Sequence, residues 1–147
     1  MESNRILLLS CLILAVCSGC GSNSDLRVVT TGHQSDAVAL WVSNHSMHSR
    51  AKRPRILEAK VFFDGAESEV TPQIEVLNSK YGWSEHASFT ADSPAETAEI
   101  VAVVESNGRT YTVKQCWSSV QNPGMTGSSW VPGRSSIIKR DRQGKGK

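Results

Sequence analysis

Apolar and polar residues alternate along this chain in short runs, and the runs are separated by residues typical of turns. No long window keeps the helical spacing of apolar positions, whereas segments rich in β-branched residues recur between Gly, Pro, Asn and Asp. Seven segments are predicted as strands: 26–31, 37–44, 55–63, 67–77, 87–90, 99–106 and 109–117. Together they predict an all-β fold, a single small antiparallel β-sandwich of about seven strands.

Two pairs of residues are specific enough to predict tight hairpin turns. Asp64-Gly65 and Asn107-Gly108 suit the positive φ angles of a two-residue turn between antiparallel strands. The second turn also predicts a register, in which Ser106 lies opposite Arg109, Val104 opposite Tyr111, and Ala102 opposite Val113. One face of this hairpin is therefore expected to be apolar and to pack on a core.

Other local features complete the predicted fold. Within segment 55–63, one face is expected to carry Leu57, Ala59, Val61 and Phe63. Because Pro72 cannot donate to a strand ladder, segment 67–77 is expected at a sheet edge or with a bulge. Residues 78–83 are expected to form a loop, and residues 94–99 a single helical turn capped by Ser93.

The composition changes after Trp117 to Ser, Gly, Asn and Pro. The sandwich domain is therefore predicted to cover residues 26–117, and residues 118–147 to form a tail with a basic end. One additional edge strand is expected near 135–138. The whole arrangement resembles immunoglobulin-like and fibronectin-III-like modules of extracytoplasmic proteins, on the number and spacing of the strands alone.

The first residues have the pattern of an export signal, because a short charged start is followed by an apolar run from Ile6 to Cys17. This run is shorter than the roughly 20 residues that cross a bilayer as a helix. It ends in Ser18-Gly19-Cys20, which resembles the lipobox of bacterial lipoproteins.

The resemblance implies that residues 1–19 are a signal peptide, that Cys20 carries the lipid, and that residues 20–25 form a linker. Cys17 departs from the pattern, which usually has Leu at that position. An ordinary secretory signal, cleaved to leave a protein without lipid, is the alternative. Gly21 in place of Asp implies sorting to the outer membrane if the cell is Gram-negative.

Charge is distributed unevenly along the chain. Ten acidic and two basic residues lie between Ile56 and Gly108, whereas eight basic residues and one acidic residue follow from Arg109 onward. The basic end could contact anionic lipid or polymer. Nucleic acid is not an expected partner, because the chain is predicted to be exported. With three cysteines assigned to the signal and the lipid, Cys116 is expected to be a small buried hydrophobe in a strand.

Candidate chemistry is sparse. His45 and His48, separated by two residues in a basic segment, are weak metal-ligand candidates that His33, His86 or Cys116 would have to complete. The chain lacks the sequence motifs of hydrolases and phosphate-binding loops. We therefore predict no catalytic residue and no cofactor.

Tryptophan offers a different kind of site. Trp41 and Trp117 fall in predicted strands and are expected to pack in the core. Trp83 and Trp130 fall in predicted loops, which makes them candidates for an exposed interface.

These observations predict an exported, lipid-anchored envelope protein that acts as a binding or structural module. Its expected partners are the membrane, through Cys20, and another envelope protein or a polysaccharide. The alternatives are a periplasmic metal-binding protein that uses the loop histidines, and an envelope enzyme of unknown class.

Overall fold

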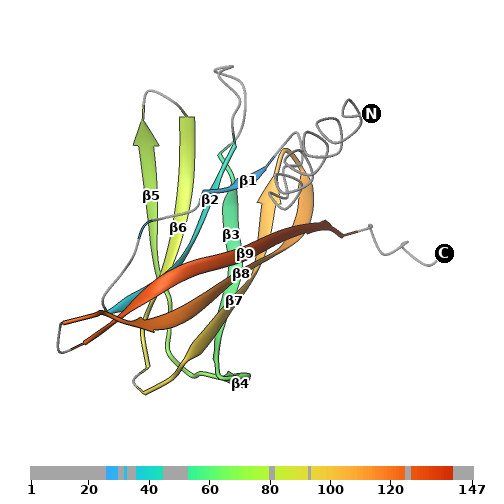
Figure 1. Ribbon diagram of the computed structural model, residues 1–147. Coiled ribbons are helices and arrows are strands. Elements are labelled where there is room, and N and C mark those ends of the chain that lie inside the picture. Colours follow the sequence, from blue (N-terminus) through green and yellow to red (C-terminus); the bar gives the residue numbers. More distant parts are fainter. Residues whose placement is uncertain are drawn as a thin grey trace, which may run out of the picture.

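A computed structural model describes residues 26–29, 32, 36–44, 53–79, 82–92, 94–124 and 127–140. These residues form two antiparallel sheets packed as a sandwich, shown in Figure 1. The four-stranded sheet has the order β1-β2-β6-β5, and the five-stranded sheet has the order β4-β3-β7-β8-β9. The all-β prediction is thus confirmed. The predicted signal peptide, Cys20, the linker, His45 and His48 lie outside the described residues.

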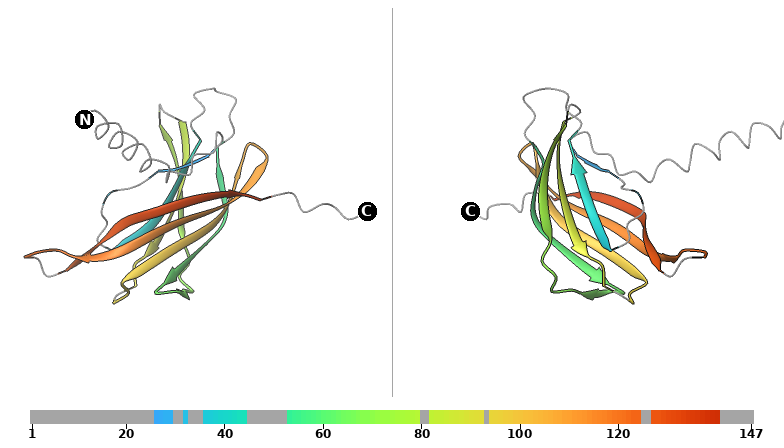
Figure 2. Two further views of the ribbon diagram at one scale, coloured as in Figure 1. Left: turned by 45° about the vertical axis from the view of Figure 1, so that its right-hand side comes forward. Right: turned by 90° about the vertical axis from the view of Figure 1, so that its left-hand side faces the viewer.

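The strands of the first sheet are β1 (Arg27–Val28), β2 (Ala37–Ser43), β5 (Gln73–Ser79) and β6 (Gly82–Thr90). Those of the second are β3 (Arg55–Phe63), β4 (Ala66–Glu67), β7 (Thr97–Ser106), β8 (Arg109–Gln121) and β9 (Ser128–Lys139). In the left view of Figure 2, β8 and β9 run obliquely across β5 and β6. Among the described residues, no helix has the length and apolar character to cross a membrane.

The core lies between the two sheets. The strictly alternating burial along β7 and β8 places Ile100, Ala102, Val104, Tyr111 and Val113 in it, as the sequence predicts. The other sheet contributes Val38, Leu40, Val42, Ala87 and Phe89. The indole N–H of Trp117 donates to the carbonyl oxygen of Ala39 at 3.0 Å, so one hydrogen bond of a buried side chain joins the two sheets.

Both predicted hairpin turns are confirmed. Asn107 and Gly108 have φ angles of 50° and 72°, and the register of β7 against β8 matches the predicted one. At the other turn, Asp64 and Gly65 have φ angles of 48° and 83° and join β3 to β4. Positive φ at two successive positions is what a type I′ turn requires, so these residues direct the chain back on itself locally.

The helical turn predicted at 94–99 is wrong, because β7 begins at Thr97. The Asp64 carboxylate explains the difference. It accepts hydrogen bonds from the backbone N–H groups of Glu96 and Thr97 and from the Thr97 hydroxyl, at 2.8 to 3.0 Å through Oδ1. These bonds, the backbone N–H of Thr97 first, lower the pKa of Asp64. They hold this segment against the β3–β4 turn in place of a helix.

Two strand predictions are corrected by the pairing of the strands. Leu57 was expected on the core face of β3, but the register against β7 shifts between Ile56 and Glu58, and the bulge leaves Leu57 exposed. Segment 67–77 is divided: β4 pairs with β3, and β5 pairs with β6 in the opposite sheet. Pro72 lies in the crossing between them, and β5 is an edge strand, as Pro72 predicted.

The five-stranded sheet extends past residue 117, where the domain was expected to end. β8 continues to Gln121, and β9 pairs with β8 from Ser128 to Lys139. The edge strand expected near 135–138 is therefore the last part of a strand of 12 residues. Pairing of this length makes the segment up to Lys139 part of the sandwich.

Candidate interaction edge

The strand β5 is exposed on both of its faces. Every described side chain from Gln73 to Asn78 is exposed, and the exposed fractions of Ile74, Val76 and Leu77 are 46%, 40% and 37%. On its inner edge β5 pairs with β6, and no described strand pairs with its outer edge. In Figure 1 it is the outermost strand of its sheet. Strands in a sandwich usually bury one face against the core, so β5 exposes more apolar surface than a typical strand of a sandwich.

One side of the β5–β6 hairpin carries an apolar strip, which we define as Ile74, Val76 and Trp83. Residues directly opposite each other in antiparallel strands share a face. Ile74 lies opposite the core residue Ala87, and Asn78 lies opposite Trp83. The strip therefore continues the inner face of the four-stranded sheet onto residues that remain exposed.

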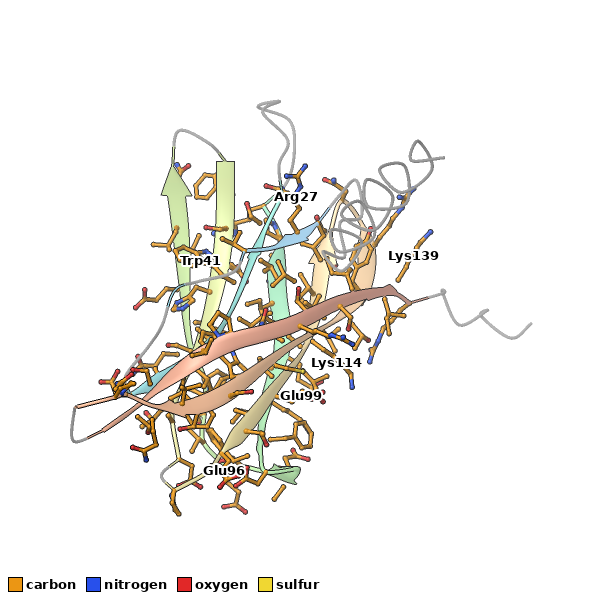
Figure 3. The ribbon with its side chains drawn as sticks, viewed as in Figure 1. Arg27, Trp41, Glu96, Glu99, Lys114 and Lys139 are labelled. Atoms are coloured by element: carbon orange, nitrogen blue, oxygen red, sulfur yellow. The ribbon has the colours of Figure 1, made fainter. Side chains whose placement is uncertain are left out.

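The opposite side of the same hairpin is more polar. Glu75 lies opposite His86, which in turn lies opposite Trp41. The Trp41 and His86 rings are in tilted contact, with centroids 5.3 Å apart. Burial lowers the pKa of His86, and Glu75 opposes this effect. The buried indole N–H of Trp41, labelled in Figure 3, has no hydrogen-bond partner within the described structure.

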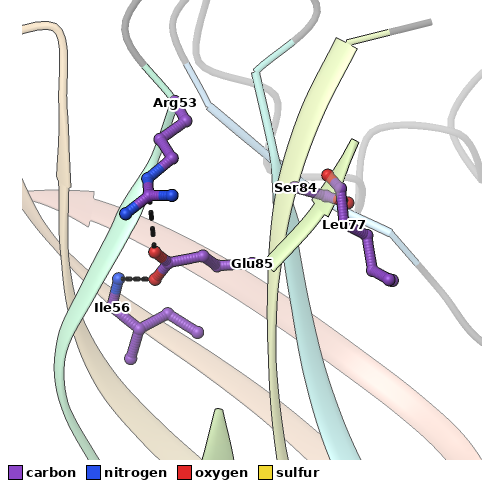
Figure 4. A network of polar contacts seen from close by, with 5 residues as sticks. All are labelled: Arg53, Ile56, Leu77, Ser84 and Glu85. Atoms are coloured by element: carbon purple, nitrogen blue, oxygen red, sulfur yellow. Dashed lines mark hydrogen bonds and ion pairs between the residues drawn. The ribbon is translucent and has the colours of Figure 1, made fainter. Parts of the chain in front are cut away.

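A buried carboxylate fixes the hairpin to the other sheet. Glu85 on β6 is 5% exposed, and its carboxylate accepts a hydrogen bond from the backbone N–H of Ile56 on β3. The other carboxylate oxygen lies 3.9 Å from Nε of Arg53, whose side chain is half exposed (Figure 4). The carboxylate thus meets the backbone of β3 where the bulge begins, and it sets the position of β6.

The remaining sheet edges differ from β5. Strands β1 and β4 are two residues long, and β9 contains Pro132, Gly133, Arg134 and Lys139. Short edges, proline and positive charge are the devices by which proteins prevent strands of other chains from pairing with an edge. Strand β5 has Glu75 as its one charged residue and contains no proline. It therefore lacks the protective features of β1, β4 and β9.

Two concave regions formed by described residues lie elsewhere. One, of about 640 Å³, has Asp36, Asp92 and Glu96 in its lining, with the buried Trp130. The other, of about 400 Å³, lies beside Cys116 and Glu99. Within the described residues, no group of three or more His, Cys, Asp or Glu side chains is arranged to hold a metal ion.

Cys116 lies in a strand as expected, but on the outer face and only partly buried, because the core positions of β8 alternate with it. Its Sγ is 3.9 Å from a carboxylate oxygen of Glu99, which also pairs with Lys114 at 3.3 Å (Figure 3). Partial burial raises the pKa of the Cys116 thiol, Glu99 raises it further, and Lys114 opposes both. This environment disfavours the reactive thiolate.

The two tryptophans predicted at an interface have different positions. Trp130 is 4% exposed in β9, with its ring centroid 6.1 Å from that of Phe63, so it is a core residue and the expected loop position is wrong. Trp83 is 39% exposed as an interface candidate would be, but it lies in β6 and not in a loop.

Sequence reasoning missed the exposed aliphatic residues of β5. The available signal was the run Ile74-Glu75-Val76-Leu77, which begins two residues after Pro72. It places apolar residues on both faces of a strand that the proline had already assigned to an edge.

Comparison of the chain with protein-family models, with curated proteins and with solved structures gave no match.

Proposed function

We propose that this protein is an exported binding module, held at a membrane by lipid on Cys20, that takes a strand of a partner protein at β5. The observation that carries the binding role is an edge strand of seven residues with exposed aliphatic side chains on both faces. An unpaired edge offers backbone N–H and C=O groups at a regular spacing, and an extended segment can add to it as a further strand. The neighbouring apolar strip would then contact alternate side chains of that segment.

A protein partner fits this edge better than a polysaccharide does, because a sugar chain cannot continue the backbone ladder. The hydrogen bonds would come from the backbone, and the side chains of β5 would select among sequences. Glu85 supports this role by holding β6, and through it β5, against β3. The finer likeness to immunoglobulin-like modules, many of which act by binding, belongs to the same proposal.

The anchor is proposed from the residues around Cys20. Stable attachment needs more than one acyl chain, which the lipoprotein pattern implies. We expect Cys20→Ala to release the full-length protein from the membrane fraction of the producing cell, whereas the matched change Cys17→Ala leaves it there. Unchanged membrane retention of Cys20→Ala would defeat the anchor.

The binding role has a separate test. A photocrosslinking amino acid at position 77, on exposed β5, is expected to form a covalent protein adduct in intact cells that express the full chain. The same amino acid at position 138, on the protected edge strand β9, is the control, because Ile138 is also exposed. Equal adduct formation at both positions, or none at position 77, would contradict strand addition at β5.

A further inference from the structure

We infer that the partner of β5 is β5 of a second copy of this chain, paired antiparallel about a two-fold axis that passes through Val76. The inference rests on the proposed function, because it names the partner of the same edge. It follows from the length of the strand, the position of its one charge, and the arrangement of its apolar side chains.

Self-pairing about a two-fold axis restricts the register. In an antiparallel pair, directly opposite residues share a face, so a residue cannot lie opposite its neighbour in the sequence. The axis must therefore lie between two copies of the same residue. An axis at Val76 uses the whole of Gln73–Ser79, because three residues of the strand lie on each side of it. Axes at Ile74, Glu75 or Leu77 leave part of the strand unpaired.

Charge favours the same register. With the axis at Val76, Glu75 of one copy lies opposite Leu77 of the other, and the two carboxylates are not opposed. With the axis at Glu75, the two carboxylates lie directly opposite each other, an arrangement that destabilises strand pairs. The register that pairs the most residues thus also avoids direct opposition of the two Glu75 side chains.

The apolar strips of the two copies meet at this axis. Two-fold symmetry perpendicular to the sheet keeps each face on the same side, so the two Val76 side chains lie opposite each other. Ile74 of each copy lies opposite Asn78 of the other, which neighbours Trp83. On the other side, Leu77 of each copy packs beside Glu75 of its partner. Each exposed aliphatic side chain of β5 thereby gains a directly opposite neighbour on the other copy.

The other edges suit this contact less well. Pro132 and Gly133 interrupt β9, and a β5–β9 contact would use different surfaces on the two copies, which generates open chains of copies unless the rotation closes. Pairing of seven residues is small beside a standard interface of about 1,200 to 2,000 Å². The dimer is therefore expected to be reversible, and a shared membrane would raise its local concentration.

The experiment uses two differently tagged copies of the full chain, expressed together, with the photocrosslinking amino acid at position 77 of one copy. We expect an adduct that carries both tags, in which mass spectrometry joins position 77 to the segment 73–79 of the other copy. Val76→Lys in both copies places like charges on the axis and should lower the adduct yield by about fivefold. Val76→Lys in one copy with Val76→Glu in the other should restore it.

The charge-reversal rescue separates a contact at the axis from damage to the fold, since both variants must be folded for the adduct to return. Ile138→Lys in both copies is the matched control and should leave the yield unchanged. An adduct at position 77 with another protein alone, or with β9 of a second copy, overturns the two-fold dimer and leaves strand addition standing. If position 77 gives no adduct at all, both proposals are wrong.

Discussion

Replacement of the buried carboxylate of Glu85 tests how the β5–β6 hairpin is held against the other sheet. In Glu85→Ala the buried backbone N–H of Ile56 loses its acceptor, which costs about 1 to 3 kcal/mol. Loss of one buried methylene group adds about 0.8 kcal/mol. Arg53 is half exposed and 3.9 Å away, so loss of this ion pair adds less than about 1 kcal/mol. We expect the free energy of unfolding to fall by about 3 kcal/mol.

Two further variants separate the contributions. Glu85→Gln keeps the methylene groups and an acceptor for Ile56, and should cost about 1 kcal/mol. Arg53→Ala removes only the half-exposed cation and should cost less than about 1 kcal/mol. Glu69→Ala, at an exposed acidic position between β4 and β5, is the control and should stay within about 0.5 kcal/mol of the unaltered protein.

The assay is urea unfolding followed by tryptophan fluorescence, with free energies from linear extrapolation. The reasoning predicts the order Glu85→Ala, then Glu85→Gln, then Arg53→Ala, from the largest loss to the smallest. If Arg53→Ala destabilises the protein as much as Glu85→Ala does, the ion pair and not the Ile56 hydrogen bond holds the hairpin. A loss below about 1 kcal/mol for Glu85→Ala would refute the conclusion that the Glu85 carboxylate holds the hairpin against the other sheet.

Two other predictions concern residues that the sequence had placed differently. Trp130→Ala should lower the free energy of unfolding by about 3 to 5 kcal/mol, because the ring is buried. Trp83→Ala should lower it much less, because this ring is partly exposed. Equal losses in urea unfolding would contradict the core position of Trp130. The rate of alkylation of Cys116 by iodoacetamide should rise with pH, with a midpoint above the ordinary thiol pKa of 9.0, because burial and Glu99 favour the protonated form. Glu99→Gln should lower this midpoint. An unchanged dependence of the rate on pH would count against the contact between Glu99 and Cys116.

Local turn chemistry made part of this fold predictable from sequence. Asn107-Gly108 and Asp64-Gly65 prefer the positive φ angles that a two-residue turn needs, so the turn and the register beside it depend on neighbouring residues alone. The alternation from Ile100 to Val113 then predicted the buried face correctly. Pro72 predicted an edge because the missing N–H is a property of that residue.

The C-terminal part of the fold depended on contacts that no local pattern records. The extension of the sheet past Trp117 and the burial of Trp130 depend on pairing between β8 and β9 and on Phe63 from a distant strand. The composition of residues 118–139, rich in Ser and Gly, resembled a tail because the pairing partner was not visible in it.

The sequence by itself determined the all-β class, the two hairpin turns and the edge position of the strand after Pro72, because each depends on residues that are adjacent or regularly spaced. Only the tertiary structure decided which sheet β5 joins, that both of its faces remain exposed, and that Glu85 meets the backbone of Ile56. Burial is a property of what lies across the sandwich, and the residues that cover a side chain are set by the packing of strands far apart in the chain. The interaction edge at β5 is therefore a result of the fold.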